Sequence, residues 1–178
     1  MCCISSNLKP FLYASGVILV NAMCLFNWFI SIFTQTSIQM KIIIINGPNL
    51  NLLGKREPEV YGTITFADYF QELQHKYSSI ELDYYQSNIE GELIDKTQEV
   101  GFTYDGIILN AAAYTHTSVG IGDAVKAITT PVVEVHISNT FSRETFRHQS
   151  FIAPNAFGII AGFGLKSYDL AIQAILNK

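Results

Sequence analysis

Short apolar runs recur along most of the chain, and stretches with helical periodicity separate them. The clearest run is residues 42–45, four consecutive isoleucines of the kind that form a strand buried on both faces of a parallel sheet. Because each run is short and ends near turn-forming residues, the pattern predicts strands rather than helices. Further strands are predicted at residues 80–86, 105–110, 132–136 and 157–163.

The intervals between the runs have the period of amphipathic helices. Apolar residues between 66 and 73 recur at i, i+3, i+4 and i+7, and Thr65 before them is a suitable N-cap, so a helix is predicted to about Tyr77. Ser87 and Glu90 have capping-box spacing at the start of a second helix. That helix is predicted to end at Gly101, and further helices are predicted at 117–129, 142–149 and 167–177.

Strands that alternate with helices predict an α/β fold, with a parallel sheet covered by helices on both faces. Five such units suggest a flavodoxin-like three-layer sandwich with strand order 2-1-3-4-5. In this topology ligands bind at the carboxyl ends of the strands, where strands 1 and 3 flank the switch point. The ends of strands 1, 3 and 4 would bring Asn46 and Asn49, Asn110, and His136 with Ser138 to that edge.

Composition divides the chain near residue 40. Residues 1–39 hold all three cysteines, the only tryptophan and a single charge, Lys9, and residues 11–33 carry no formal charge. Two interpretations remain open: residues 1–39 are a signal or membrane-anchor segment, or Met40 is the true start of the protein. In either case residues 40–178 are predicted to form the catalytic domain.

The part of the chain after residue 39 is acidic and has no cysteine. It holds ten of the eleven basic residues and all fifteen acidic ones, a formal charge of −5, which argues against a nucleic-acid partner. The lack of cysteine fits a cytoplasmic protein, although residues 1–39 leave membrane association open. The sequence has no GxGxxG, Walker, CxxC or HExxH motif, so neither a cofactor nor a metal is expected.

Two histidines lie at or after the carboxyl ends of predicted strands. His136 alternates with Glu134 and Ser138, which places the three on one side of a strand, where a carboxylate can orient the ring and favour the protonated form that a general acid needs. A histidine that is simply satisfied at a strand end is the alternative. His116 precedes a helix and is a candidate ligand for substrate oxygens, or part of a capping cluster in which Thr117 or Ser118 is the cap.

Arginines and one tyrosine complete the candidate chemistry. Arg143 and Arg147 are four residues apart, which on a helix puts both on one face and suits them to bind an anion. A solvated charged face is the alternative. Tyr61 is a poor base at neutral pH, because its ordinary pKa is about 10, unless cations such as Arg56 stabilise the phenolate. A tyrosine that only anchors the loop to the core is the alternative.

Six motifs follow one another between about residue 40 and the C-terminus. They are residues 45–54 (INGPNLNLLG), 56–58 (REP), 61–62 (YG), 110–118 (NAAAYTHTS), 134–139 (EVHISN) and 146–148 (FRH). Together, and in this order, they resemble one family, the type II 3-dehydroquinate dehydratases.

The resemblance implies a reaction and a role for each residue. The reaction is a cofactor-free anti elimination of water from 3-dehydroquinate through an enolate, in the shikimate pathway or in quinate breakdown. The implied roles are proton acceptor for Tyr61, proton donor for His136, transition-state stabiliser for Arg56, enolate stabiliser for Asn49, and substrate binding for Asn110, His116, Asp123, Ile137, Ser138 and Arg147, with Glu134 and Arg143 in support.

The resemblance also implies a dodecamer built of trimers, in which Asp123 acts on a neighbouring subunit's site. Two positions depart from the family pattern: an alanine, Ala112, stands where glycine is frequent, and Gln149 stands where a second histidine is common. Neither is a proposed proton donor or acceptor, so activity is expected to survive. A non-catalytic flavodoxin-like binding module is the rival hypothesis.

Overall fold

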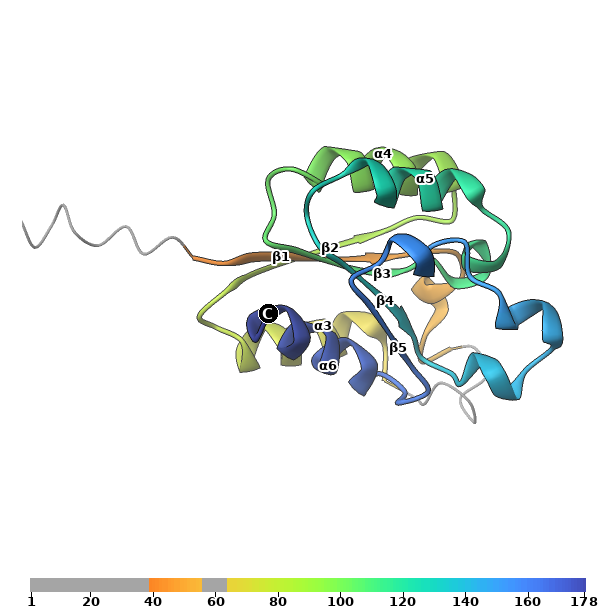
Figure 1. The fold of residues 1–178 in the computed structure, drawn as a ribbon. Coiled ribbons are helices and arrows are strands. Elements are labelled where there is room, and N and C mark those ends of the chain that lie inside the picture. Colours follow the sequence, from red (N-terminus) through yellow and green to blue (C-terminus); the bar gives the residue numbers. More distant parts are fainter. Residues whose placement is uncertain (1–38, 56–63) are drawn as a thin grey trace, which may run out of the picture. The chain divides into compact units, whose positions relative to one another are not determined.

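In a computed structural model, which describes residues 39–55 and 64–178, a five-stranded parallel sheet forms the centre of the unit Gln39–Lys178 (Figure 1). The strand order is β2-β1-β3-β4-β5, which confirms the order predicted from the sequence. The described elements belong to one unit, Gln39–Lys178. The strands are β1 (Lys41–Asn46), β2 (Glu81–Gln86), β3 (Gly106–Asn110), β4 (Val132–His136) and β5 (Gly158–Ala161).

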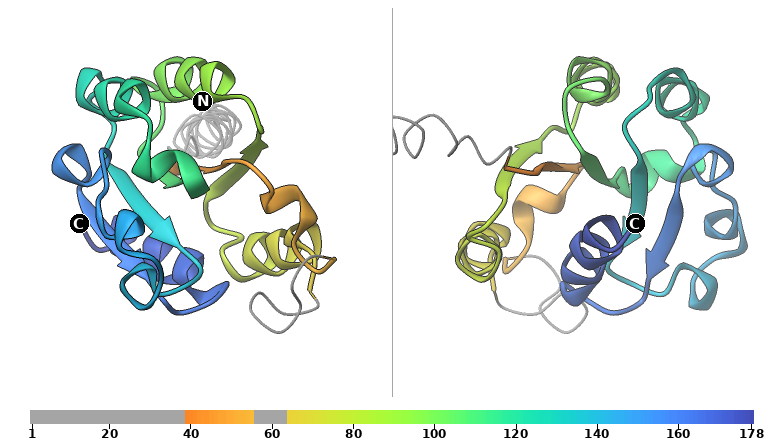
Figure 2. Two further views of the ribbon diagram at one scale, coloured as in Figure 1. Left: turned by 90° about the vertical axis from the view of Figure 1, so that its right-hand side faces the viewer. Right: turned by 60° about the vertical axis from the view of Figure 1, so that its left-hand side comes forward.

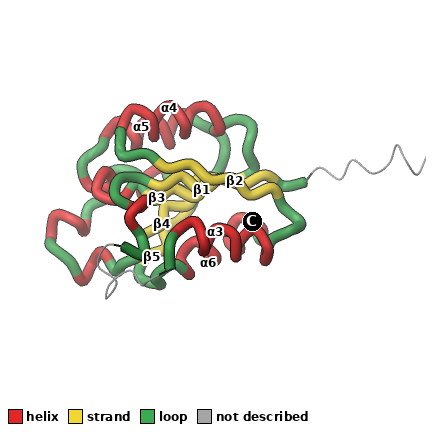
Figure 3. The backbone as a smooth tube through the Cα atoms, turned by 180° about the vertical axis from the view of Figure 1, so that it is seen from behind, coloured by secondary structure: helices red, strands yellow, loops and turns green. Residues whose placement is uncertain are grey.

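Helices cover both faces of this sheet. In Figures 1 and 3, α4 and α5 lie on one face and α3 and α6 on the other, and the end-on view in Figure 2 shows the same three layers. The helices are α3 (Phe66–Lys76), α4 (Glu90–Val100), α5 (Val119–Ala127) and α6 (Lys166–Leu176). Short 3-10 turns are η1 (Leu50–Leu52), η2 (Ala112–His116), η3 (Thr140–Ser142), η4 (Thr145–His148) and η5 (Ala153–Asn155).

The isoleucines of β1 explain why the sheet needs two covering layers. Ile42 and Ile44 pack in one core cluster with Phe66 and Leu73 of α3 and with residues of α6. Ile43 and Ile45 point the other way and belong to a second cluster with residues of α4 and α5. Because successive side chains of a strand alternate between faces, an uninterrupted apolar run is stable only where both faces of the sheet are covered.

The helix starts test the capping predictions. Thr65 is the N-cap of α3, and its hydroxyl accepts the hydrogen bond of the Asp68 amide, as predicted. The capping box at Ser87 is wrong, because α4 begins at Glu90 with Ile89 as its N-cap. The Ser87 hydroxyl is already engaged: it accepts the Ile89 amide and donates to the side chain of Glu92.

The predicted helix at 142–149 is also wrong. The segment forms two 3-10 turns, η3 and η4, and Arg143 between them is extended, with φ −107° and ψ −167°. Local side-chain bonds compete with helical ones here, since Asn139 accepts from the Phe141 amide and Ser142 donates to the Asn139 carbonyl. The predicted fifth strand is shorter than expected as well, because Gly162 leaves the strand conformation with φ +92°.

Among residues 39–55 and 64–178, no helix has the length and apolar character needed to cross a membrane. The apolar segment at 11–33 lies outside the described residues.

A buried carboxylate joins α3 to α6. Asp169 accepts hydrogen bonds from the Lys76 ammonium and from the Tyr77 hydroxyl, each at 2.6 Å. Burial would raise the pKa of Asp169, but the hydrogen bonds from Lys76 and Tyr77 outweigh it and hold the pKa below its usual range. The contacts of Asp169 with Lys76 and Tyr77 therefore stabilise the fold while Asp169 is ionised.

This network predicts an acid-sensitive contribution to stability. A carboxyl group whose pKa is lower in the folded than in the unfolded chain stabilises the fold above its unfolded pKa of about 4, and the contribution disappears as pH falls through the lower folded pKa. We expect Asp169→Asn to lower the free energy of unfolding at pH 7 and to reduce its decline below about pH 4. Urea unfolding at several pH values measures both. Asp95→Asn, on an exposed position of α4, should reproduce neither effect.

Candidate active site

A pocket opens at the carboxyl ends of β1, β3 and β4, the edge at which the sequence predicted it. Its cavity volume is about 160 Å³. The residues that follow three different strands form its wall, so no single segment contains the site. The lining residues are Pro48, Asn49, Leu50, Leu52, Leu53, Asn110, Ala112, Ala113, His116, His136, Ile137, Ser138, Thr140, Arg143 and Arg147.

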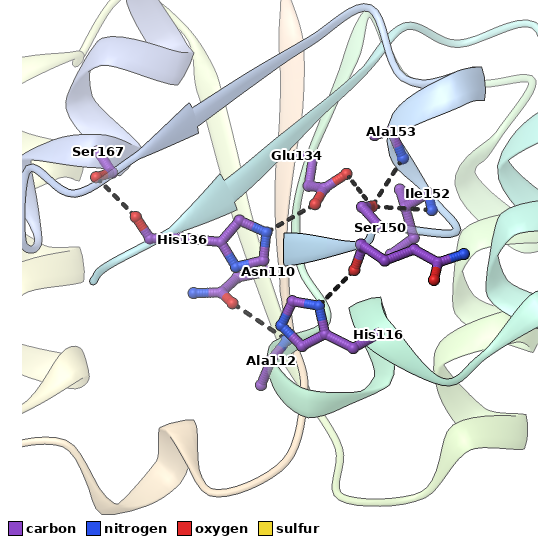
Figure 4. Close-up of polar contacts among 10 residues, drawn as sticks. Asn110, Ala112, His116, Glu134, His136, Ser150, Ile152, Ala153 and Ser167 are labelled. Atoms are coloured by element: carbon purple, nitrogen blue, oxygen red, sulfur yellow. Dashed lines mark hydrogen bonds and ion pairs between the residues drawn. The ribbon is translucent and has the colours of Figure 1, made fainter. Parts of the chain in front are cut away.

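His136 and Glu134 form a buried pair at the end of β4 (Figure 4). The Nε2 of His136 lies 2.7 Å from the Oε1 of Glu134, and the two residues are 7% and 1% exposed. A carboxylate can only accept, so Nε2 carries a hydrogen and donates it. The Nδ1 edge of the ring is therefore the one left to exchange a proton with a bound molecule. Alternation along the strand predicted this pair correctly.

His116 lies parallel to His136 across the pocket. The two ring centroids are 6.0 Å apart with an interplanar angle of 15°. The Nδ1 of His116 lies 2.6 Å from the Gln149 carbonyl oxygen, which can only accept, so Nδ1 is the donor. The neutral ring then presents the lone pair of Nε2, which suits it to receive a hydrogen bond from a hydroxyl. Ser118, one of the two residues predicted as the cap, is the N-cap of α5, and its hydroxyl accepts the Ile121 amide.

Two asparagines come from the ends of β1 and β3. Asn49 has a left-handed backbone, with φ +66°, a conformation that asparagine tolerates well, and its amide donates to the side chain of Asn88. Asn110 is 3% exposed, and its Nδ2 donates to the buried hydroxyl of Tyr168 at 2.7 Å. The first contact fixes the backbone at Asn49, and the second holds the side chain of Asn110 in place before anything binds.

Two arginines give part of the pocket wall a positive charge. Arg143 and Arg147 both line the pocket, although they share no helix face, and both pair with Glu144, at 3.7 and 2.7 Å. Hydrogen bonds from its own backbone amide and from Arg147 hold the pKa of Glu144 below its usual range. Two guanidinium groups with one carboxylate leave a net positive charge, which suits an anionic group of a ligand.

The remaining predicted site residues differ in where they lie. Ile137 and Ser138 line the pocket directly after β4. Asp123 lies exposed on α5, outside the lining of this pocket. Arg56 and Tyr61 lie outside the described residues. Asn46 does not reach the pocket, because its side chain is buried and accepts from Tyr168.

The departures from the family pattern have specific places in the structure. Ala112 has φ +52°, in the left-handed region where a residue with a Cβ is strained by about 1 kcal/mol and glycine is not. Its amide donates to the Oδ1 of Asn110 at 3.2 Å, so the loop keeps its contact with the site. Gln149 touches His116 through its backbone carbonyl, a group that any residue would supply.

Sequence reasoning missed the residues behind the pocket. Tyr168 connects two strand ends: it accepts from Asn110 and donates to the Oδ1 of Asn46 at 2.8 Å. Ser150 contacts Glu134. Neither contact has a local signal, because each joins residues from different elements.

Tyr168→Phe provides a test of this connection. It removes one hydroxyl and leaves the Nδ2 of Asn110 and the Oδ1 of Asn46 without that partner, so we expect a loss of about 1–3 kcal/mol in the free energy of unfolding. Urea unfolding measures the loss. Tyr85→Phe is the control. It removes a hydroxyl whose contact with Glu92 is long, at 3.5 Å, so the loss in the free energy of unfolding should be much smaller. Equal losses in the two variants would contradict the prediction.

In the part of the chain that the structure describes, no three histidine, cysteine, aspartate or glutamate side chains are grouped so as to bind a metal ion.

Comparison with known proteins gives consistent matches. Residues 40–176 match the family model described as dehydroquinase class II. A 3-dehydroquinate dehydratase from Exiguobacterium is 54% identical over 139 residues, which cover 78% of this chain and 95% of that protein. Another from Acaryochloris marina is 51% identical over 138 residues, covering 76% of this chain and 93% of that protein.

Solved structures agree with these relatives. The crystal structure of a type II dehydroquinase from Butyrivibrio crossotus is 45% identical and superposes with a TM-score of 0.75, over 79% of this chain and 99% of that chain. A type II dehydroquinase from Propionibacterium acnes is 35% identical with a TM-score of 0.72, over 79% of this chain and 99% of that chain.

Proposed function

This chain belongs to the dehydroquinase class II family, and from that membership and the geometry of its pocket we propose that it is a hydro-lyase that converts 3-dehydroquinate to 3-dehydroshikimate. The observation that carries the proposal is the buried Glu134–His136 pair at 2.7 Å, which leaves Nδ1 for proton transfer in a pocket with a positive wall. The reaction is proposed to need no cofactor and to belong to the shikimate pathway or to quinate breakdown.

His136 is the proposed proton donor. Its Nδ1–H bond breaks, the proton passes to the departing C1 hydroxyl, and the C–O bonding pair leaves with oxygen as water. The ring is then neutral with its hydrogen on Nε2, the tautomer that the carboxylate of Glu134 already requires. No rearrangement of the pair accompanies the transfer, which supports this assignment.

Tyr61 is the proposed proton acceptor at C2. Its ordinary pKa of about 10 makes it a weak base at neutral pH, so the phenolate needs nearby cations. Arg56, in the same motif region, and the arginines of the pocket wall are the candidates. Arg56 is further proposed to stabilise the transition state. The family motif at 56–62 supports both roles.

Asn49 is the proposed enolate stabiliser. Proton loss at C2 puts negative charge on the C3 oxygen, and a fixed donor lowers the energy of that charge. The left-handed backbone of Asn49 and the hydrogen bond from its backbone N–H to Asn88 support a fixed backbone from which the side chain reaches the pocket. A water held by Asn49 is the proposed link to the oxygen.

The remaining pocket residues are proposed to bind the substrate. Arg147 and Arg143 suit a carboxylate, and Asn110, His116 and the backbone at Ile137 and Ser138 suit the ring hydroxyls. Asp123 is proposed to act from a neighbouring subunit of a dodecamer built of trimers. Its exposed place outside this chain's own pocket supports that arrangement, and the mass of the assembly in solution tests it.

Ultraviolet absorbance tests the function directly, because dehydration creates a conjugated enone carboxylate. We expect absorbance to rise when the purified full-length chain meets 3-dehydroquinate in the presence of a metal chelator. The same assay on residues 40–178 tests whether that part is the catalytic domain. Folded full-length protein that binds the substrate without a change in absorbance would instead support the non-catalytic binding module.

A further inference from the structure

Ser150 makes three hydrogen bonds at once, beside the proposed proton donor (Figure 4). Its Oγ accepts the amide of Ile152 at 3.1 Å and that of Ala153 at 2.9 Å. Its Oγ also lies 2.9 Å from the Oε2 of Glu134. A serine hydroxyl has one hydrogen and two lone pairs. Because the two amides use both lone pairs, the hydrogen is directed to Glu134.

The carboxylate of Glu134 is thereby held at both ends. Oε1 receives the hydrogen of His136 Nε2 at 2.7 Å, and Oε2 receives that of Ser150. Among the described residues, Ser150 supplies the only hydrogen bond to Oε2. Glu134 is 1% exposed, so water does not readily replace a lost partner, and a buried carboxylate with one bare oxygen is costly.

The same loop also orients the second histidine. Gln149, the residue before Ser150, accepts the hydrogen of His116 Nδ1 through its carbonyl. The amide of Phe151, the residue after it, donates to the Thr115 carbonyl at 3.0 Å and ties the loop to η2. Three consecutive residues therefore connect the loop to both sides of the pocket.

We propose that Ser150 is a positioning residue for the dehydration: it holds the Glu134 carboxylate in the rotation in which His136 keeps its hydrogen on Nε2 and presents Nδ1 to the leaving hydroxyl. The proposal rests on the proposed function. The direction of every hydrogen along the chain of bonds, from the backbone amides through Ser150 and Glu134 to His136, is set by what each atom can donate or accept.

Ser150→Ala tests the role. Without the Ser150 hydroxyl, the Glu134 carboxylate can turn, and the His136 ring is then less often held with Nδ1 aimed at the leaving hydroxyl. We expect kcat to fall by about 10–100-fold, the size of effect seen when a residue that orients a metal-binding histidine is lost, with KM within about two-fold. Ser150→Thr keeps the hydroxyl and should recover most of kcat.

Ser87→Ala is the matched control. Ser87 also accepts an amide two residues ahead, that of Ile89, and also donates to a glutamate, Glu92. The control loses a comparable set of bonds away from Glu134, so thermal unfolding should show a similar loss of stability while kcat stays close to that of the wild type. An equal loss of kcat in both variants would mean that Ser150 acts only through stability.

A double-mutant cycle separates positioning from general damage. If Ser150 acts through Glu134, then Ser150→Ala should lower kcat by less than about two-fold in a Glu134→Gln background. The same 10–100-fold loss in both backgrounds would overturn the proposal.

A measurement without substrate distinguishes failure of this proposal from failure of the proposed function. Long-range ¹H–¹⁵N spectra report which ring nitrogen of His136 carries the hydrogen. The wild type should show an Nε2 hydrogen, and Ser150→Ala should show a mixture of tautomers. An unchanged spectrum in Ser150→Ala would refute the positioning role, even if the full-length chain had no dehydratase activity.

Discussion

Tyr61→Phe is expected to abolish measurable turnover while the protein remains folded. The change removes only the phenol oxygen, which is the atom proposed to take the C2 proton, and loss of a general base costs about 10²–10⁴-fold in rate. The measurement is kcat from the rise in ultraviolet absorbance. Circular dichroism and urea unfolding should give values close to those of the wild type, since the substitution keeps the aromatic ring and removes only its hydroxyl.

Tyr85→Phe is the control for this variant. Tyr85 lies on β2, and its hydroxyl makes only a 3.5 Å contact with Glu92, so its removal should leave kcat unchanged. If Tyr61→Phe kept a kcat within a few-fold of that of the wild type, Tyr61 could not be the base.

His136→Gln is expected to lower kcat by a similar factor, about 10²–10⁴-fold, but at a different step. The amide of glutamine can still donate to Glu134, so the buried carboxylate keeps a partner, but it has no ionisable proton to give to the leaving hydroxyl. On an enolate route, removal of the C2 proton precedes loss of the hydroxyl. The variant should therefore still form the enolate and return it to substrate.

Hydrogen exchange at C2 separates the two variants. In D₂O, His136→Gln should exchange the C2 proton of 3-dehydroquinate without forming product. Tyr61→Phe should neither exchange this proton nor form product. Proton NMR follows the exchange and the product. His75→Gln, at an exposed position of α3, is the control and should match the wild type. Product formation by His136→Gln at the wild-type rate would remove His136 from the mechanism.

Much of the fold followed from local pattern. The run at 42–45 predicted a strand covered on both faces, and the alternation of strands and helices predicted the order β2-β1-β3-β4-β5. These predictions hold because period and capping act within a few residues. The prediction of a helix at 142–149 was wrong for a related reason. The segment is short and buries no apolar face, so the side-chain hydrogen bonds of Asn139 and Ser142 replace helical ones.

The active-site pair shows the same division between local and long-range information. Two residues apart on one strand, Glu134 and His136 share a face by period alone, so the sequence by itself determined that they would meet. Other contacts behind the pocket join residues that are far apart in the sequence. Ser150 is 16 residues from Glu134, and Tyr168 is 122 residues from Asn46, and no periodic pattern connects either pair.

The sequence by itself thus determined the layers, the strand order and the edge at which the chemistry gathers. Only the tertiary structure decided which atoms of the histidines face the pocket, because that depends on the Gln149 carbonyl and the Ser150 hydroxyl arriving from another loop. Secondary structure reflects interactions between near neighbours. The direction of a proton is set by donors and acceptors that come together only when the sheet has assembled.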